Sequence, residues 1–115
     1  MTIVSRKKIL QKINQYWPSV DAKEVMDVLD RYGVKSSERG RVRVQLAILK
    51  LSAGQRERLP ELVEMAQSDY RDALAYAEYP EEMQLGFVGM SNLSPEEAKF
   101  VRQRDREQYV EWLTD

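Results

Sequence analysis

Carboxylates and tyrosines are the side chains of this sequence whose spacing could support chemistry. Residues 69–82 contain five acidic residues: Asp69, Asp72, Glu78, Glu81 and Glu82. Tyr76 and Tyr79 lie in the same segment. Asp69 and Asp72 are about one helical turn apart and could share a divalent cation. Two carboxylates are a minimal set for a metal, however, and acids near a helix start are favourable there by themselves. We therefore predict no metal site, no cofactor and no catalytic residue.

Two residue types that carry much of enzyme chemistry are absent. The chain contains no cysteine and no histidine. It therefore cannot form a disulfide, a cysteine-bound zinc site, or the Ser-His-Asp and Cys-His arrangements of nucleophilic catalysis. An enzyme would have to rely on carboxylates, lysine or tyrosine with pKa values tuned by burial. The sequence predicts a protein that is not an enzyme.

A basic cluster leads into the segment "ERGRVRVQLAILKL", residues 38–51. It consists of Lys35, Arg39, Arg41 and Arg43, which we predict to form a charged contact. On a helix, Arg39 and Arg43 are like charges at i,i+4, close to the N-terminus, where the helix dipole disfavours cations. Each penalty is below about 1 kcal/mol, and together they indicate that an acidic group lies nearby.

Two sources of that acidic group remain open. The first source is the chain itself, whose acidic helices could fold against the cluster and neutralise its charge. The acids concerned are Glu61, Glu64, Asp69 and Asp72. Otherwise the cluster is an open site for an acidic protein segment or a phosphate backbone. Residues 35–58 hold seven basic and two acidic side chains, and residues 59–98 hold one and nine, which suits either source. The net charge of −1 disfavours nucleic acid, which stays the alternative partner.

An apolar segment is the second candidate contact. Leu85, Phe87, Val88 and Met90 follow one another closely, with glycines on both sides of Phe87 and Val88. The segment is either a lid packed over the rest of the chain or a mobile arm that docks on a partner. The arm could also exchange the last helix between two copies. We predict that Phe87, Val88 and Met90, together with Trp112 near the chain end, are apolar contacts.

The helix period decides how "ERGRVRVQLAILKL" folds. Strand-like alternation of apolar and polar residues fails in its second half, which favours a helix. At 100° per residue its apolar side chains divide between two opposite faces: Val42, Leu46 and Leu49 on one, and Val44, Ile48 and Leu51 on the other. Ser36 or Ser37 can cap its start and Gly54 can end it. We therefore predict a buried central helix over residues 37–52.

Helix caps and prolines indicate five further helices. A first helix spans Ser5 to Tyr16 and is stopped by Pro18. Asp21 and Ser94 begin capping-box patterns, Pro60 suits a first helical turn, and Ser68 or Asp69 restarts a helix that ends before Pro80. The sequence predicts an all-α bundle of about six helices in a single domain, residues 1–115. Its compact body spans residues 5–80, a glycine-containing linker spans 81–94, and the C-terminal helix spans 95–113.

Part of this pattern resembles a known group of sequences. "RVRVQLAILKLSAG" followed by "DYRDALAYAEYP" is similar to a pattern in small uncharacterised bacterial proteins that are all-helical. The resemblance covers about Arg41 to Pro80, a third of the chain. It implies an all-helical fold and a bacterial origin, and it brings no assigned activity.

The class of protein follows from these observations. A chain of 115 residues is long enough for one domain with a sizeable core. No apolar run reaches the roughly 18 residues of a membrane span, and the first residues lack the pattern of a signal peptide. We expect a cytoplasmic protein with no membrane contact. Its predicted role is a non-catalytic protein–protein interaction or regulatory domain that binds another protein or itself, as a homodimer.

Overall fold

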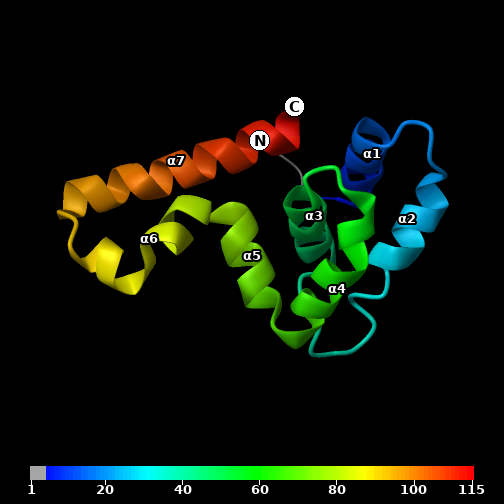
Figure 1. The fold of residues 1–115 in the computed structure, drawn as a ribbon, viewed down its shortest axis with the longest axis horizontal. Coiled ribbons are helices and arrows are strands. Elements are labelled where there is room, and N and C mark those ends of the chain that lie inside the picture. Colours follow the sequence, from blue (N-terminus) through cyan, green and yellow to red (C-terminus); the bar gives the residue numbers. More distant parts are fainter. Residues whose placement is uncertain (1–4) are drawn as a thin grey trace.

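The structure is a computed structural model that describes residues 5–115. In this range it contains seven α-helices, one short 3₁₀ helix and no strand, which confirms the all-α prediction (Figure 1). In chain order the elements are α1 (Arg6–Tyr16), α2 (Ala22–Leu29), α3 (Arg41–Ser52), η1 (Arg56–Arg58), α4 (Leu59–Ser68), α5 (Tyr70–Glu78), α6 (Pro80–Ser91) and α7 (Pro95–Thr114).

Helix α3 lies at the centre of the fold, as predicted. All six residues from Val44 to Leu49 are buried, because α1, α4 and α5 pack around this helix. The two apolar faces expected from its sequence both contribute to the packing, and Val42 and Leu51 are the partly buried residues at their edges. A continuous run of buried residues is typical of a helix surrounded on most sides.

The start of α3 differs from the prediction. The helix begins at Arg41 rather than near residue 37, and neither Ser36 nor Ser37 caps it. Gly40 holds the N-cap position in the left-handed region, at φ 61°. Glu38 folds back instead, and its carboxylate accepts hydrogen bonds from the backbone N–H groups of Gly33 and Val34. Residues 33–40 therefore form a turn, held by a contact that helix periodicity does not reveal.

Residues 81–91, which we predicted to be part of an irregular linker, form helix α6. Pro80 lies in its first turn, where its missing N–H costs nothing, and only Asn92 to Ser94 separate α6 from α7. Gly86 interrupts the helix at φ 70° and ψ −178°, a conformation open almost only to glycine. The two glycines of this segment hid the helix from sequence reasoning because glycine has a low helix propensity.

Helix α6 and the first half of α7 form an arm, defined here as residues 80–104. In Figure 1 the arm projects from the group of α1 to α4, and α7 runs from the far end of the arm back toward α1. The main core contains no residue between 79 and 108 among the described part of the chain. The fold measures 47 × 29 × 25 Å, an elongated shape that the arm explains. The compact body therefore includes the end of α7 as well as residues 5–80.

Asp105 of α7 joins that helix to the start of α6. Its carboxylate is 1% exposed and accepts hydrogen bonds from the backbone N–H groups of Glu81, at 2.8 Å, and Glu82, at 3.0 Å. These donors lie in the first turn of α6, where helical N–H groups have no partner within the helix. No side chain of α6 itself caps this end. Asp105 of α7 thus caps α6 through a tertiary contact.

Replacing Asp105 with alanine tests this cap. We expect Asp105→Ala to lower the free energy of unfolding by about 1–3 kcal/mol, because two N–H donors lose their acceptor. The amides of Glu81 and Glu82 should also exchange faster with deuterium. Urea unfolding followed by circular dichroism gives the first effect, and hydrogen–deuterium exchange gives the second.

Glu107→Ala is the matched control for this substitution. Glu107 is an exposed acid on the same helix, so its loss should change the free energy of unfolding by less than about 0.5 kcal/mol. Equal effects of the two substitutions, or unchanged exchange at Glu81 and Glu82, would contradict the tertiary cap.

Candidate functional site

Arg43, one residue of the predicted charged contact, is paired within the chain. Its guanidinium donates two hydrogen bonds to Glu78 of α5, at 2.8 Å from Nε and 2.6 Å from Nη2. Glu78 is 7% exposed, so this bidentate pair lies at the edge of the core. The acid that meets Arg43 is therefore not one of the four that we predicted. Of those, Glu61 pairs with Arg58 and Asp69 pairs with its neighbour Arg71.

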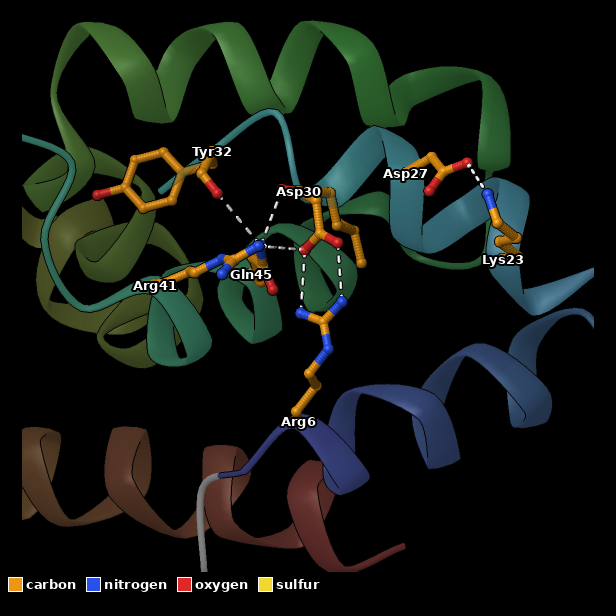
Figure 2. A network of polar contacts seen from close by, with 8 residues as sticks. Arg6, Lys23, Asp27, Asp30, Tyr32, Arg41 and Gln45 are labelled. Atoms are coloured by element: carbon orange, nitrogen blue, oxygen red, sulfur yellow. Dashed lines mark hydrogen bonds and ion pairs between the residues drawn. The ribbon is translucent and has the colours of Figure 1, made fainter. Parts of the chain in front are cut away.

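Arg41 belongs to a different polar network, shown in Figure 2. Its guanidinium lies 3.0 Å from the carboxylate of Asp30, which also accepts two hydrogen bonds from Arg6 of α1, at 3.0 and 2.8 Å. Gln45 of α3 donates to the same carboxylate at 3.2 Å. Asp30 therefore connects α1, the end of α2 and α3 through one charged side chain.

The environment of Asp30 favours its ionised form. The hydrogen bonds from Arg6 lower the pKa of Asp30 to about 2, and Gln45 and Arg41 act in the same direction, while burial opposes them. A carboxyl whose pKa is lower in the folded state than in the unfolded state stabilises the fold at neutral pH. Arg41 thus contributes to folding and is not a free cation.

Gln45 completes the end of α2. Its side-chain nitrogen also donates to the backbone carbonyls of Leu29, at 2.9 Å, and Tyr32, at 3.3 Å (Figure 2). The last carbonyl groups of a helix have no N–H donor in a following turn of that helix, so they accept hydrogen bonds from groups outside it. Gln45 is fully buried, so this polar residue supports the fold from inside the core.

Lys35 and Arg39 complete the predicted charged contact. Both side chains are exposed, and neither forms an ion pair among the described residues. The turn that carries them is held through its backbone, because the Tyr32 hydroxyl donates to the carbonyl of Arg39 at 2.6 Å. The structure therefore does not join the four cations into one site. Two of them are held by different acids, and two face solvent.

Four of the five acids in residues 69–82 have structural partners, and Glu78 is the one that meets Arg43. Asp69 caps α5 by accepting from the backbone N–H of Arg71, at 3.0 Å. Glu81 and Glu82 form ion pairs with Arg104 and Arg102 across the arm, at 2.6 and 3.5 Å. Within residues 5–115, the acids form no group of three or more that could hold a metal ion.

The predicted apolar contact is exposed in its central part. Phe87 is 89% exposed and Val88 is 70% exposed, whereas Met90 is partly buried. Helix α6 has no buried residue at all. Leu85 precedes these residues and is also exposed. Leu85, Phe87 and Val88 form what we call the outer patch of α6.

Trp112 lies apart from the outer patch. It is near the far end of α7, where it packs against the core and its ring nitrogen donates to the Tyr16 hydroxyl at 2.8 Å. Its ring stacks on Tyr109 of the same helix and lies under the ammonium group of Lys12, 4.6 Å from its centre. The structure therefore gives Trp112 a packing role and separates it from Phe87.

Two neighbouring hollows that sequence reasoning missed lie beside α7, and together we call them the groove. One hollow of about 460 Å³ lies between the two helices of the arm, and a second of about 430 Å³ lies farther along α7. Arg102 lines both hollows. The apolar residues of the first hollow come from α6 and are Met83, Phe87 and Met90. Those of the second hollow are Tyr79, Tyr109 and Val110. Residues 102–108, "RQRDREQ", are all polar, so they contain no apolar pattern that would predict this groove.

Comparison with protein-family models, curated proteins and solved structures finds no match to this chain. The resemblance to small helical bacterial proteins therefore stays a prediction. Within residues 5–115, none of the helices has an apolar stretch of the length that crossing a bilayer requires. The function has to be inferred from the residues and their geometry.

The Asp30 network predicts how stability depends on pH. Because the folded state lowers the pKa of Asp30, its pairing with Arg6 stabilises the fold above about pH 4, and this contribution is lost as the pH falls toward about 2. We expect Asp30→Asn to lower the free energy of unfolding by about 1–2 kcal/mol at pH 7, a value that allows for solvent screening. Urea unfolding at several pH values should show the difference from wild type shrinking below about pH 4.

Asp27→Asn serves as the control for Asp30→Asn. Asp27 forms an exposed i,i+4 pair with Lys23, and such pairs contribute little to the free energy of unfolding. A deficit in Asp30→Asn that does not change with pH, or that Asp27→Asn reproduces, would contradict the assignment of the stabilising charge to Asp30.

Proposed function

We propose that this protein is a non-catalytic binding module that recognises another protein through the outer patch of α6. The observation that supports this proposal is the 89% exposure of Phe87 on a helix that buries no residue. Single exposed apolar residues are common on protein surfaces, but adjacent ones on one short element are typical of interaction sites. Leu85, Phe87 and Val88 lie within four residues of one another.

Burial of the outer patch by a partner supplies useful binding energy. Covering a phenylalanine or valine side chain contributes about 1.5–3 kcal/mol each. The patch therefore suits a contact in which a few apolar residues carry most of the affinity. An arm that projects from the fold also leaves room for a partner to approach it (Figure 1).

The backbone of α6 supports the same proposal. The conformation of Gly86 interrupts the helix directly before Phe87 and Val88. Nothing lies within 4 Å of the place where a side chain of Gly86 would begin, so close packing does not explain the glycine. Backbone strain of this kind is concentrated at functional sites. We infer that the kink serves to present the two apolar residues.

The alternative function, binding of nucleic acid or phosphate through Lys35, Arg39, Arg41 and Arg43, has less support. Arg41 and Arg43 are engaged by Asp30 and Glu78, so two cations remain exposed there. Two cations provide weak, salt-sensitive affinity for a phosphate backbone.

We propose that the protein acts in a bacterial cytoplasm, as the resemblance implies.

Affinity capture with variant baits tests the proposed function. Phe87→Ser combined with Val88→Ser removes most of the exposed apolar surface with little effect on stability, because both side chains are already in solvent. We expect proteins recovered from the source cell by the wild-type bait to fall about tenfold or more with this bait. Quantitative mass spectrometry measures the recovery.

Val34→Ser is the matched control bait. Val34 is 78% exposed but lies in the turn before α3, outside the arm. It should recover the same proteins as wild type. Equal recovery by the Phe87/Val88 bait, or no specific recovery by the wild-type bait, would count against binding through the outer patch.

A further inference from the structure

Helix α6 covers one face of α7. Ala98, Val101 and Asp105 are spaced i, i+3 and i+7, which places them on one face of that helix. Asp105 meets the first turn of α6, so the same face is directed toward α6. Ala98 and Val101 are 9% and 4% exposed, yet neither belongs to the main core. They form a separate buried surface, which α6 shields from solvent.

The polar contacts between the two helices are confined to one end of α6. The Asp105 carboxylate accepts hydrogen bonds from the backbone N–H groups of Glu81 and Glu82, and the side chains of both glutamates pair with arginines of α7. In the part of the chain that the structure describes, no hydrogen bond or ion pair joins residues 83–91 to α7. The rest of α6 is therefore held on α7 by van der Waals packing alone.

That packing is loose. The partly buried residues of this stretch are Gly86, Gly89 and Met90, so two of the three have no side chain to place against α7. A hollow of about 460 Å³ lies between the two helices. The non-helical conformation of Gly86 also interrupts the hydrogen-bond ladder of α6, so the capped first turn gives little support to residues 87–91. Few buried contacts and an interrupted helix are features of a segment that opens locally.

We infer that α6 is a lid over Ala98 and Val101, which opens while the body of the protein stays folded and which the Asp105 cap holds closed. Opening breaks the cap and exposes the two apolar side chains of α7 beside the outer patch. The main core keeps all its contacts, because it contains no residue of α6. A partner that prefers the open or the closed form would shift the equilibrium between them.

The two connections of α6 suit this movement. Tyr79, which joins α6 to α5, lies outside the helical region at φ −130° and ψ 51°, so the two helices do not form one continuous rod. At the other end, Asn92 to Ser94 form a short non-helical link to α7. Rotation at these two points moves α6 without a change inside α5 or α7.

Thiol labelling measures the opening, because the chain contains no cysteine and each variant therefore has a single thiol. Val101→Cys places the thiol under α6. Val63→Cys is the matched thiol in the main core, at a residue of α4 that is 2% exposed, and Ala66→Cys, 1% exposed, is a second one. With iodoacetamide and mass spectrometry under native conditions, we expect Val101→Cys to react about tenfold or more faster than either core thiol. Each rate is divided by that of the same variant unfolded in urea.

Low urea separates local opening from global unfolding. The urea dependence of a reaction scales with the surface that it exposes, and the lid is a small part of the protein. At about 1 M urea we expect labelling of Val63→Cys to accelerate about fivefold or more and that of Val101→Cys about twofold or less. Asp105→Ala should accelerate labelling of Val101→Cys about fivefold or more, because it removes the cap, whereas the matched Glu107→Ala should leave it unchanged.

Three outcomes would overturn the inference. Equal labelling of Val101→Cys and the core thiols, with the same urea dependence, would mean that α6 opens only when the whole protein unfolds. Labelling of Val101→Cys as fast as in the unfolded chain would mean that α6 does not cover α7. Unchanged labelling after Asp105→Ala would remove the cap as the contact that holds the lid closed. Binding through the outer patch is judged separately, by the capture experiment.

Discussion

Burial of α3 is the constraint on which the rest of the structure depends. Its residues from Val44 to Leu49 are inaccessible, so its polar side chains need partners from the elements around it. Gln45 meets the end of α2, and Arg43 meets Glu78 of α5. Burial lowers the pKa of Lys50, and the nearby Asp105 carboxylate of α7 partly offsets that effect. The polar groups of one helix thus orient three others.

The arm is organised differently from this body. It adds little to the main core, and α6 is held by the Asp105 cap, by packing on α7 and by two surface ion pairs. Surface ion pairs contribute little, so the cap and the limited packing carry most of the stability of α6. Segments with few buried apolar contacts have low local stability and are commonly the ones that bind partners. A partner bound at the outer patch, as we propose, would supply the burial that α6 lacks within the chain.

Ion pairs hold basic side chains in both the body and the arm. In the body, Arg41 and Arg43 have acidic partners, and these pairs join elements far apart in sequence. In the arm, Arg102 and Arg104 pair with Glu82 and Glu81 across its two helices, and Lys99 has no acidic partner among residues 5–115. The surface that we propose for partner binding, the outer patch of α6, therefore lies on a different element from the basic cluster that the sequence pattern singled out.

Much of the local structure was predictable from the sequence because it depends on neighbours a few residues apart. The two apolar faces of α3, the N-cap at Asp69 and the capping box at Ser94 all involve residues within one or two turns, and all three are present in the structure. Whether Phe87 is exposed or packed down in a lid was an alternative that the sequence left open, and the structure places it in solvent.

The tertiary structure alone decided which long-range partners meet. Asp105 caps a helix whose first donor is 24 residues away, and Arg43 reaches an acid 35 residues away. Helix α6 has two glycines and no cap of its own, so its residues favour an irregular segment until α7 supplies the missing acceptor. The sequence determined the helices that its local spacing can stabilise. Partners brought together by chain folding determined α6, the placement of Trp112 and the open groove, because their energies depend on distances that no local pattern contains.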